Sequence, residues 1–159
     1  MLFCVTGVFN CDYSLIFAAT LFVSGKSTFV NLLCCEQNPS SGDIHVQGYS
    51  VASSDKYAIR KVIGECKQDD ILWPLLTARE HLELFSGLRG VSKQDMAHTV
   101  QRWLDSVDLD SVQHARVSSF SGGMKRRLSV ALSTIGDVKI VVLDEPTTGT
   151  FPVNLNCQN

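Results

Sequence analysis

The sequence predicts an α/β fold with a small antiparallel β piece and an inserted helical subdomain. Two continuous apolar runs, "SLIFAATLF" at 14–22 and "IVVL" at 140–143, are typical of strands that are covered on both faces of a sheet. A segment with helical spacing of apolar residues follows the first run, and another precedes the second. Between them, residues 71–118 carry two amphipathic helix patterns, which indicates a helical insert within the α/β frame.

The bulk composition is that of one globular domain. The chain has 159 residues, of which 45% are hydrophobic, enough for one domain with a real core. Its 14 basic and 16 acidic residues give a net charge of −2, so no basic excess is available to neutralise nucleic-acid phosphates. We therefore expect no nucleic acid among its partners.

The cysteines and histidines show no metal-ligand spacing. We expect buried or surface thiols in a reducing compartment such as the cytosol, and histidines on the surface or in helices. The cysteines lie at positions 4, 11, 34, 35, 66 and 157, and the histidines at 45, 81, 98 and 114.

Residues 1–23 form an atypical apolar N-terminal segment. No lysine or arginine precedes its apolar run, so the basic part of a signal peptide is missing. The uninterrupted run at 13–23 is shorter than the roughly 20 residues that a bilayer requires. A membrane anchor stays an alternative, but the pattern favours a buried strand.

The patterns between the first strand and the insert predict a helix, a β piece, a second helix and a strand. "STFVNLLCC" carries apolar residues at helical spacing. "NPSSGDIHVQGYSV" combines turn residues with alternation, which is typical of one or two antiparallel strands. "KYAIRKVIGECKQDD" predicts a short helix and then a strand that ends near Gln68.

Two capping signatures mark helix starts in the insert. Thr77 and Glu80 form a capping box at the head of the first helix, and Ser92 and Asp95 have the same relation at the head of the second. "SGGMKRRLSVALSTIG" predicts a further helix, which is entered through two glycines.

The segment "SGKST" at 24–28 has the composition of a phosphate-binding loop. Backbone N–H groups in such a turn, together with the start of a helix, surround phosphate oxygens. Lys26 would reach the β- and γ-phosphates, and the Ser27 hydroxyl would bind Mg²⁺. A glycine turn with an exposed lysine stays an alternative, because the full pattern has a glycine five residues before Gly25, where Thr20 stands.

Two carboxylates follow the second apolar run. Asp144 and Glu145 emerge at the carboxyl end of the expected strand, which is where ligands bind in open α/β sheets. Asp144 would hold Mg²⁺, directly or through water, and Glu145 would polarise an attacking water as general base. The alternative is that these acids cap the next turn, since Pro146 follows.

Ser121 and the glycines after it open the predicted helix after the insert. Ser121, Gly122 and Gly123 would make a second anion-binding helix N-terminus, with an ordinary glycine-rich N-cap as the alternative. The basic run at 125–127 would be a solvated face or a partner surface.

The motifs occur in a fixed order: GKST, Gln68, the helical insert, SGG and the acidic pair. In that order they resemble the nucleotide-binding domain of ABC transporters, over about residues 24–149. "FSGGMKRRLSVAL" is similar to the signature motif of subfamily A, the lipid- and sterol-transporting group, which has Met where many relatives have Gln; here it is Met124. The resemblance implies a P-loop NTPase-type sheet core, which is incomplete in this chain.

The resemblance also implies an ATPase that uses ATP and Mg²⁺ at the membrane, on its cytoplasmic face. Its partners would be a second nucleotide-binding domain, arranged head to tail, and transmembrane domains that transport lipid. Phosphate contacts would come from Ser24, Gly25, Lys26, Ser27 and Thr28, and in trans from Ser121, Gly122 and Gly123. Mg²⁺ would be bound by Ser27, Gln68 and Asp144, with Gln68 and Glu145 as the catalytic residues.

Both ends of the chain depart from the family pattern. Thr20, Phe22 and Val23 stand where the family has glycine, asparagine and glycine, and the tail at 150–159 is divergent, with no histidine after Glu145. We therefore expect that these ends are not the natural flanks of the domain. A non-hydrolysing nucleotide-binding module and a soluble ABC ATPase stay open as alternatives.

Overall fold

The computed structural model describes residues 15–19, 26–53 and 56–144. Strands and helices follow one another as an α/β fold requires. In chain order the elements are β1 (Leu15–Ala19), α1 (Lys26–Leu33), β2 (His45–Val46), β3 (Tyr49–Ser50), α2 (Lys56–Val62), β4 (Ile63–Cys66), α3 (Ala78–Leu88), α4 (Met96–Ser106), the 3₁₀ turns η1 (Asp110–Val112) and η2 (Val117–Ser119), α5 (Gly122–Thr134) and β5 (Ile140–Asp144).

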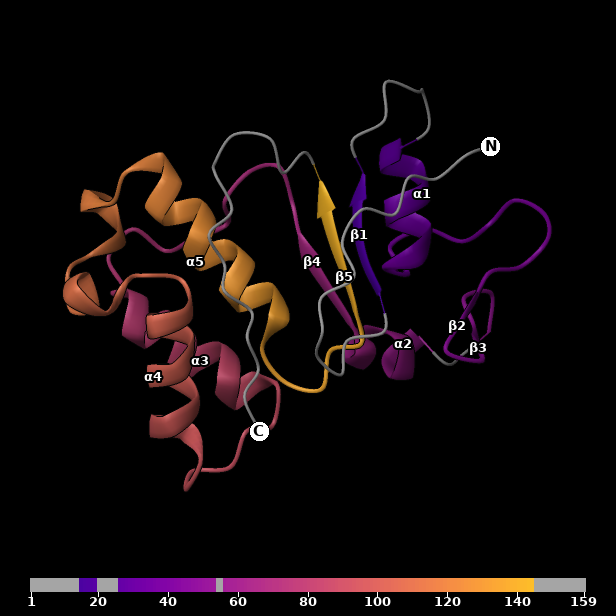
Figure 1. Cartoon of the computed structure of the whole chain (residues 1–159). Helices are drawn as coiled ribbons and strands as arrows, with labels where there is room; N and C mark the ends of the chain where they lie inside the picture. The colour runs from indigo at the N-terminus through magenta and orange to yellow at the C-terminus, as the bar shows by residue number, and fades with distance from the viewer. Residues whose placement is uncertain (1–14, 20–25, 54–55, 145–159) are drawn as a thin grey trace.

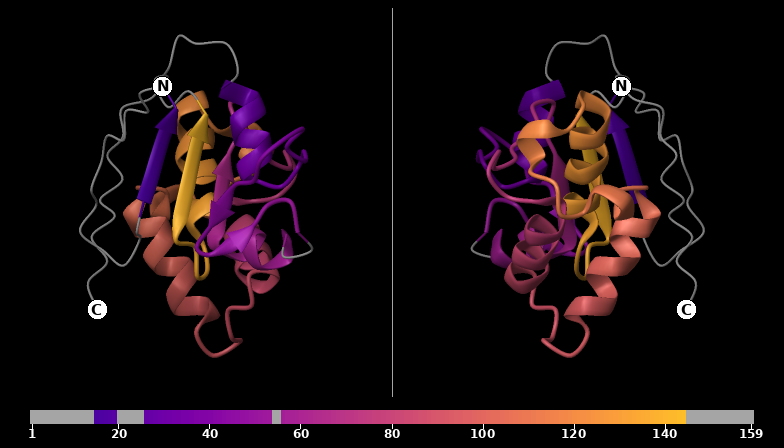
Figure 2. Two further views of the ribbon diagram at one scale, coloured as in Figure 1. Left: turned by 90° about the vertical axis from the view of Figure 1, so that its right-hand side faces the viewer. Right: turned by 90° about the vertical axis from the view of Figure 1, so that its left-hand side faces the viewer.

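A parallel three-stranded sheet with the order β1-β5-β4 lies at the centre of the fold. Ile140 of β5 is in register with Leu15 of β1 on one side and with Ile63 of β4 on the other. Figure 2 shows the strands side by side, with their carboxyl ends at one edge. The predicted strand at 140–143 is therefore the central strand of this sheet, and the run at 14–22 contains β1.

The two faces of the sheet are covered by different helices. Val142 of β5 packs with Val30 of α1, whereas Val141 and Leu143 pack with Val130 of α5. Because successive strand residues point to opposite faces, α1 and α5 lie on opposite sides of the sheet, and Figure 1 shows α3 and α4 beyond α5. None of the helices within the described residues is both long enough and apolar enough to span a bilayer.

The antiparallel piece is the β2-β3 hairpin, which confirms the interpretation of the segment around it. Its turn uses positive φ at Gln47 and Gly48, 51° and 84°, as two-residue hairpin turns of the primed type require. The Asp43 carboxylate accepts hydrogen bonds from Ile44 N at 2.7 Å and from Ser50 Oγ at 2.5 Å. The Ser50 hydroxyl, together with the backbone N–H groups of Ala52 and Ile44, lowers the pKa of Asp43, because these donors stabilise the ionised carboxylate.

The insert packs its helices onto α5 through one shared hydrophobic cluster. Leu82 of α3, Leu104 of α4 and Leu128 of α5 are fully buried in it. At the start of α3, Thr77 Oγ1 accepts from Glu80 N at 3.2 Å, and Glu80 accepts from Thr77 N at 2.7 Å, so the predicted capping box is confirmed. The division of the chain at 71–118 remains a prediction.

The start of α4 and the end of β4 differ from the prediction by a few residues. Ser92 accepts from Asp95 N at 3.2 Å, but this bond closes a turn before the helix, and α4 begins at Met96 with no side-chain cap. β4 ends at Cys66 rather than near Gln68, because Arg126 of α5 binds the main-chain carbonyls that follow the strand.

Candidate functional site

The carboxyl edge of the sheet brings together the start of α1 and the end of β5. Asp144 is the last residue of β5 and is in register with Ala19, the last residue of β1. The helix that follows β1 begins at Lys26, and the Ser27 and Thr28 side chains of its first turn are exposed. The backbone therefore places the start of the predicted phosphate-binding helix and Asp144, the residue predicted to bind Mg²⁺, at the same edge of the sheet.

Gln68 lies at this edge as well, on the segment that follows β4. Its side chain is exposed, and it lines a hollow of about 310 Å³ together with Val30 and Asn31 of α1. Lys67 next to it donates to the Glu36 carboxylate at 2.9 Å, which ties this segment to the residues after α1. The hollow therefore separates Gln68 from the helix that carries Ser27.

The start of α5 is an open helix N-terminus. Ser121 is the N-cap, and its Oγ accepts from Met124 N at 3.3 Å. A Cβ added at Gly122 or Gly123 would meet no atom of the described residues within 4 Å. The glycines are thus not required by packing inside the described chain; they leave this terminus accessible to an external group. Because α5 and α1 cover opposite faces of the sheet, the two helix starts do not form one site within the chain.

Arg126 of α5 is a residue whose role the sequence reasoning missed. Only 8% of it is exposed, and its Nη1 donates to the main-chain carbonyl of Lys67, lies 3.4 Å from that of Gln68 and faces Asp70 Oδ1 at 3.6 Å. The expectation of a solvated or partner-facing basic run is therefore wrong for this residue. The available signal was its spacing: Arg126 lies four residues before Val130, on the sheet-facing stripe of α5.

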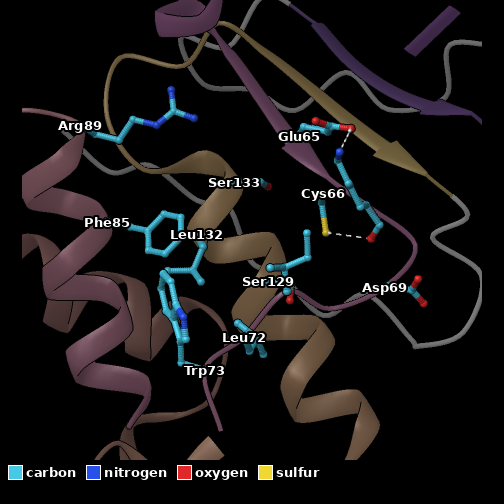
Figure 3. Close-up of a pocket in the computed structure, with 12 residues that line it drawn as sticks. Glu65, Cys66, Asp69, Leu72, Trp73, Phe85, Arg89, Ser129, Leu132 and Ser133 are labelled. Atoms are coloured by element: carbon cyan, nitrogen blue, oxygen red, sulfur yellow. Dashed lines mark hydrogen bonds and ion pairs between the residues drawn. The ribbon is translucent and has the colours of Figure 1, made fainter. Parts of the chain in front are cut away.

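A second hollow of about 280 Å³ lies between β4, α3 and α5 (Figure 3). Phe85 of α3, Leu132 of α5 and Trp73 make its apolar part, and Cys66 of β4 lies at its other side. Arg89 borders it and donates to the carbonyl of Ile63 at 3.3 Å; burial lowers the pKa of this guanidinium. The hollow thus opens where the insert meets the sheet.

Three of the predicted site residues, Ser24, Gly25 and Glu145, lie outside the described residues. Ser27, Gln68 and Asp144, the residues predicted to bind Mg²⁺, lie at or near the carboxyl edge of the sheet, and their residue types supply the oxygen donors that Mg²⁺ prefers. Within the described part of the chain, no group of three or more His, Cys, Asp or Glu side chains could hold a metal ion. A hydroxyl, an amide and a carboxylate are residue types that fit a Mg²⁺ ion whose other ligands are phosphate oxygens and water.

Comparison with known families decides the identity of this arrangement. The family model described as ABC transporter matches residues 24–148. The chain belongs to the ABC transporter family. The predicted recognition of a nucleotide-binding domain of the subfamily A type is confirmed.

Relatives of this ABC transporter domain include members of subfamily A. ABC transporter A family member 1 of Dictyostelium discoideum is 48% identical over 128 residues, which cover 80% of this chain and 14% of that protein. Cholesterol transporter ABCA5 of Mus musculus is 37% identical over 130 residues, covering 81% of this chain and 8% of that protein. The chain therefore spans a small part of the length of these relatives.

Solved structures confirm the α/β fold of the P-loop NTPase type. The ATP-binding subunit of an ABC transporter has a TM-score of 0.70 at 23% identity, covering 81% of this chain and 54% of that chain. A dimeric ATP-binding cassette, solved after hydrolysis with ADP and phosphate bound, has a TM-score of 0.67 at 26% identity and covers 79% and 57%. The chain thus has part of this fold.

Proposed function

We propose that this domain binds ATP with Mg²⁺ and hydrolyses the terminal phosphate. The observation that carries the proposal is the shared sheet edge, which gathers the start of α1, Gln68 and Asp144. In open α/β sheets ligands bind at this edge, outside the carboxyl ends of the strands. A helix N-terminus there favours an anion, because its unpaired N–H groups carry partial positive charge.

Different residues at this edge of the sheet would bind the phosphates and the Mg²⁺ ion. Ser24 and Gly25 would present backbone N–H groups to phosphate oxygens, and Lys26 would add a positive charge at the β- and γ-phosphates. Ser27, with Gln68 and Asp144, would hold Mg²⁺. Bound there, the metal supplies positive charge that offsets the charge developing on the phosphate oxygens.

Hydrolysis would depend on the residue after β5. Glu145 would accept a proton from the attacking water while Gln68 orients that water or the γ-phosphate. The new bond joins the water oxygen to the γ-phosphorus, and the bond from that phosphorus to the β–γ bridging oxygen breaks, which leaves ADP and phosphate.

The open start of α5 supports a head-to-tail pair of domains. Ser121, Gly122 and Gly123 lie on the face of the sheet opposite α1, so they would contact the γ-phosphate bound by a second domain. One of the solved structures of this fold is described as dimeric. ATP would then close the pair and hydrolysis would open it.

Membrane domains would use this motion for transport of lipid, at the cytoplasmic face. Support comes from the cholesterol transporter among the relatives and from the hollow between the insert and the sheet. Beside that hollow Ile71 and Trp73 are 71% and 49% exposed, and neighbouring exposed apolar groups of this kind mark interaction surfaces.

Phosphate release by the full chain tests the catalytic part of the proposal. We expect Mg²⁺-dependent release in the wild type, and a loss of at least about 100-fold in Glu145→Gln, since general base catalysis contributes about 10²–10⁴-fold. ATP binding should persist in this variant, because Glu145 holds no phosphate. Equal release from both chains would contradict the role of Glu145; binding without release in the wild type would favour the non-hydrolysing alternative.

A further inference from the structure

We propose that Arg126 is a positioning residue that fixes the Gln68 segment to α5 and so links two nucleotide sites of a dimer. This inference rests on the proposed function in one respect: it takes Gln68 as part of the site of its own domain and Ser121 as part of the partner's site. The contact between Arg126 and the segment stands on the structure alone.

Arg126 holds the backbone of the segment and leaves the Gln68 side chain exposed. Its Nη1 donates to the carbonyl of Lys67 and lies 3.4 Å from the carbonyl of Gln68. Its charge also faces Asp70 Oδ1 at 3.6 Å. The guanidinium therefore binds residues before and after Gln68. Because the backbone is held on both sides, the direction of the Gln68 side chain is fixed.

Burial makes this contact difficult to replace. The Arg126 side chain is 10% exposed and the Asp70 carboxylate 21%. Removing one partner of a buried charged pair leaves the other without compensation, which is far more unfavourable than losing a pair in water. The segment is therefore expected to stay attached to α5 unless α5 itself moves.

The position of Arg126 on α5 connects the start of this helix to the Gln68 segment. Ser121 is the N-cap of α5, and Arg126 follows it by little more than one turn of the same helix, roughly 7–8 Å along the axis. A group that binds at Ser121 and shifts the helix start would move the Lys67–Gln68 backbone with it. In a head-to-tail pair, nucleotide binding at one site would thus change the position of Gln68 at the other site.

Hydrogen exchange of the full chain tests the attachment. In Arg126→Gln, we expect backbone amides at 66–73 to exchange about tenfold faster or more, while amides in the middle of α5 keep their protection. Arg126→Lys should restore much of the protection, because an ammonium also donates to carbonyls. Arg127→Gln is the matched control, since that arginine contacts Asp108 instead, with Nη1 3.7 Å from Oδ2.

The outcomes separate the inference from the proposed function. Unchanged exchange at 66–73 in Arg126→Gln would overturn the inference. If that variant does not fold, Asp70→Asn weakens the same junction, and unchanged exchange there would overturn it equally. The exchange measurement needs no nucleotide. A chain that bound no ATP would therefore contradict the proposed function, while the exchange rates would still test the attachment of the Gln68 segment to α5.

A second readout detects positioning rather than stability. We expect Arg126→Gln to reduce the ratio of ATP affinities with and without Mg²⁺ by several-fold, because Gln68 is misplaced, with little change in affinity when Mg²⁺ is absent. A purely structural role would lower both affinities in proportion, and that result would contradict the positioning role.

Discussion

Gly64 of β4 lies directly against the Ser133 carbonyl of α5. A Cβ at position 64 would fall 1.7 Å from that oxygen, and 3.2 Å from Cγ1 of Val138. The strand and the helix approach this closely because glycine has no side chain between them. This approach sets the distance at which α5, and with it Arg126, lies over the sheet.

Replacing Gly64 by alanine should destabilise the domain by about 1–3 kcal/mol or more, because the new methyl group meets backbone that cannot move aside independently. Urea unfolding, followed by circular dichroism, measures the effect. Gly87→Ala is the matched control: its Cβ would meet Met96 Cε at 3.9 Å, an ordinary contact, and alanine favours the helix. Equal midpoints for Gly64→Ala and the wild type would contradict the close approach.

Thr77 and Ser92 of the insert should contribute differently to the stability of the domain. Thr77→Ala removes a complete capping box and should lower the free energy of unfolding by about 1 kcal/mol. Ser92→Ala should have a smaller effect, because Ser92 closes a turn before α4 rather than capping the helix. Unfolding midpoints in urea give both values; a larger loss for Ser92→Ala would refute this assignment.

The buried Cys34 thiol should make the domain less stable in alkali. Burial, with a contribution from the Glu65 carboxylate, raises the pKa of this thiol from 9.0 to about 12. The unfolded chain then loses the proton first, so stability is retained below about pH 9 and declines as the pH rises toward 12.

Unfolding free energies of the wild type and Cys34→Ala between pH 8 and about pH 11 isolate this effect. The variant is expected to be less stable than the wild type at pH 8, but its free energy of unfolding should fall less steeply above pH 9, by up to about 1.4 kcal/mol per pH unit. Two parallel curves would show that the Cys34 thiol contributes nothing to the alkaline slope.

The residue before "SGKST" should limit the affinity for ATP. A phosphate-binding loop needs backbone with positive φ close to the phosphates, and the β-branched Val23 resists that conformation at about 1–3 kcal/mol. Val23→Gly should therefore bind ATP more tightly than the wild type in a calorimetric titration. Equal affinities would show that the loop forms without the glycine.

Much of the fold could be predicted because its signals are local. Alternation around Ile44 and Val46, the apolar run of β5 and the capping box at Thr77 each lie within a few neighbouring residues, and the structure has elements at all three places. The order of the motifs along the chain also identified the family. The order of the strands in the sheet, in contrast, is seen only in the structure.

The features that were missed depend on contacts between distant residues. Arg126 meets Lys67 across 59 positions, and that contact both buries the arginine and ends β4 early. His81 lies in helix α3, as expected, but its full burial and the hydrogen bond that its Nε2 accepts from Trp73 N at 3.0 Å were not predicted. Periodicity places such residues on a face, but it does not show which group they bind.

ATP titration of the full chain with Mg²⁺, comparing the wild type with Lys26→Ala, tests the central claim most directly. Lys93→Ala, which changes an exposed lysine of the insert, is the control for a lost charge. The shared sheet edge predicts saturable binding in the wild type and in the control, and at least about tenfold weaker binding in Lys26→Ala. Equal affinity in all three chains, or no binding by the wild type, would contradict the nucleotide site.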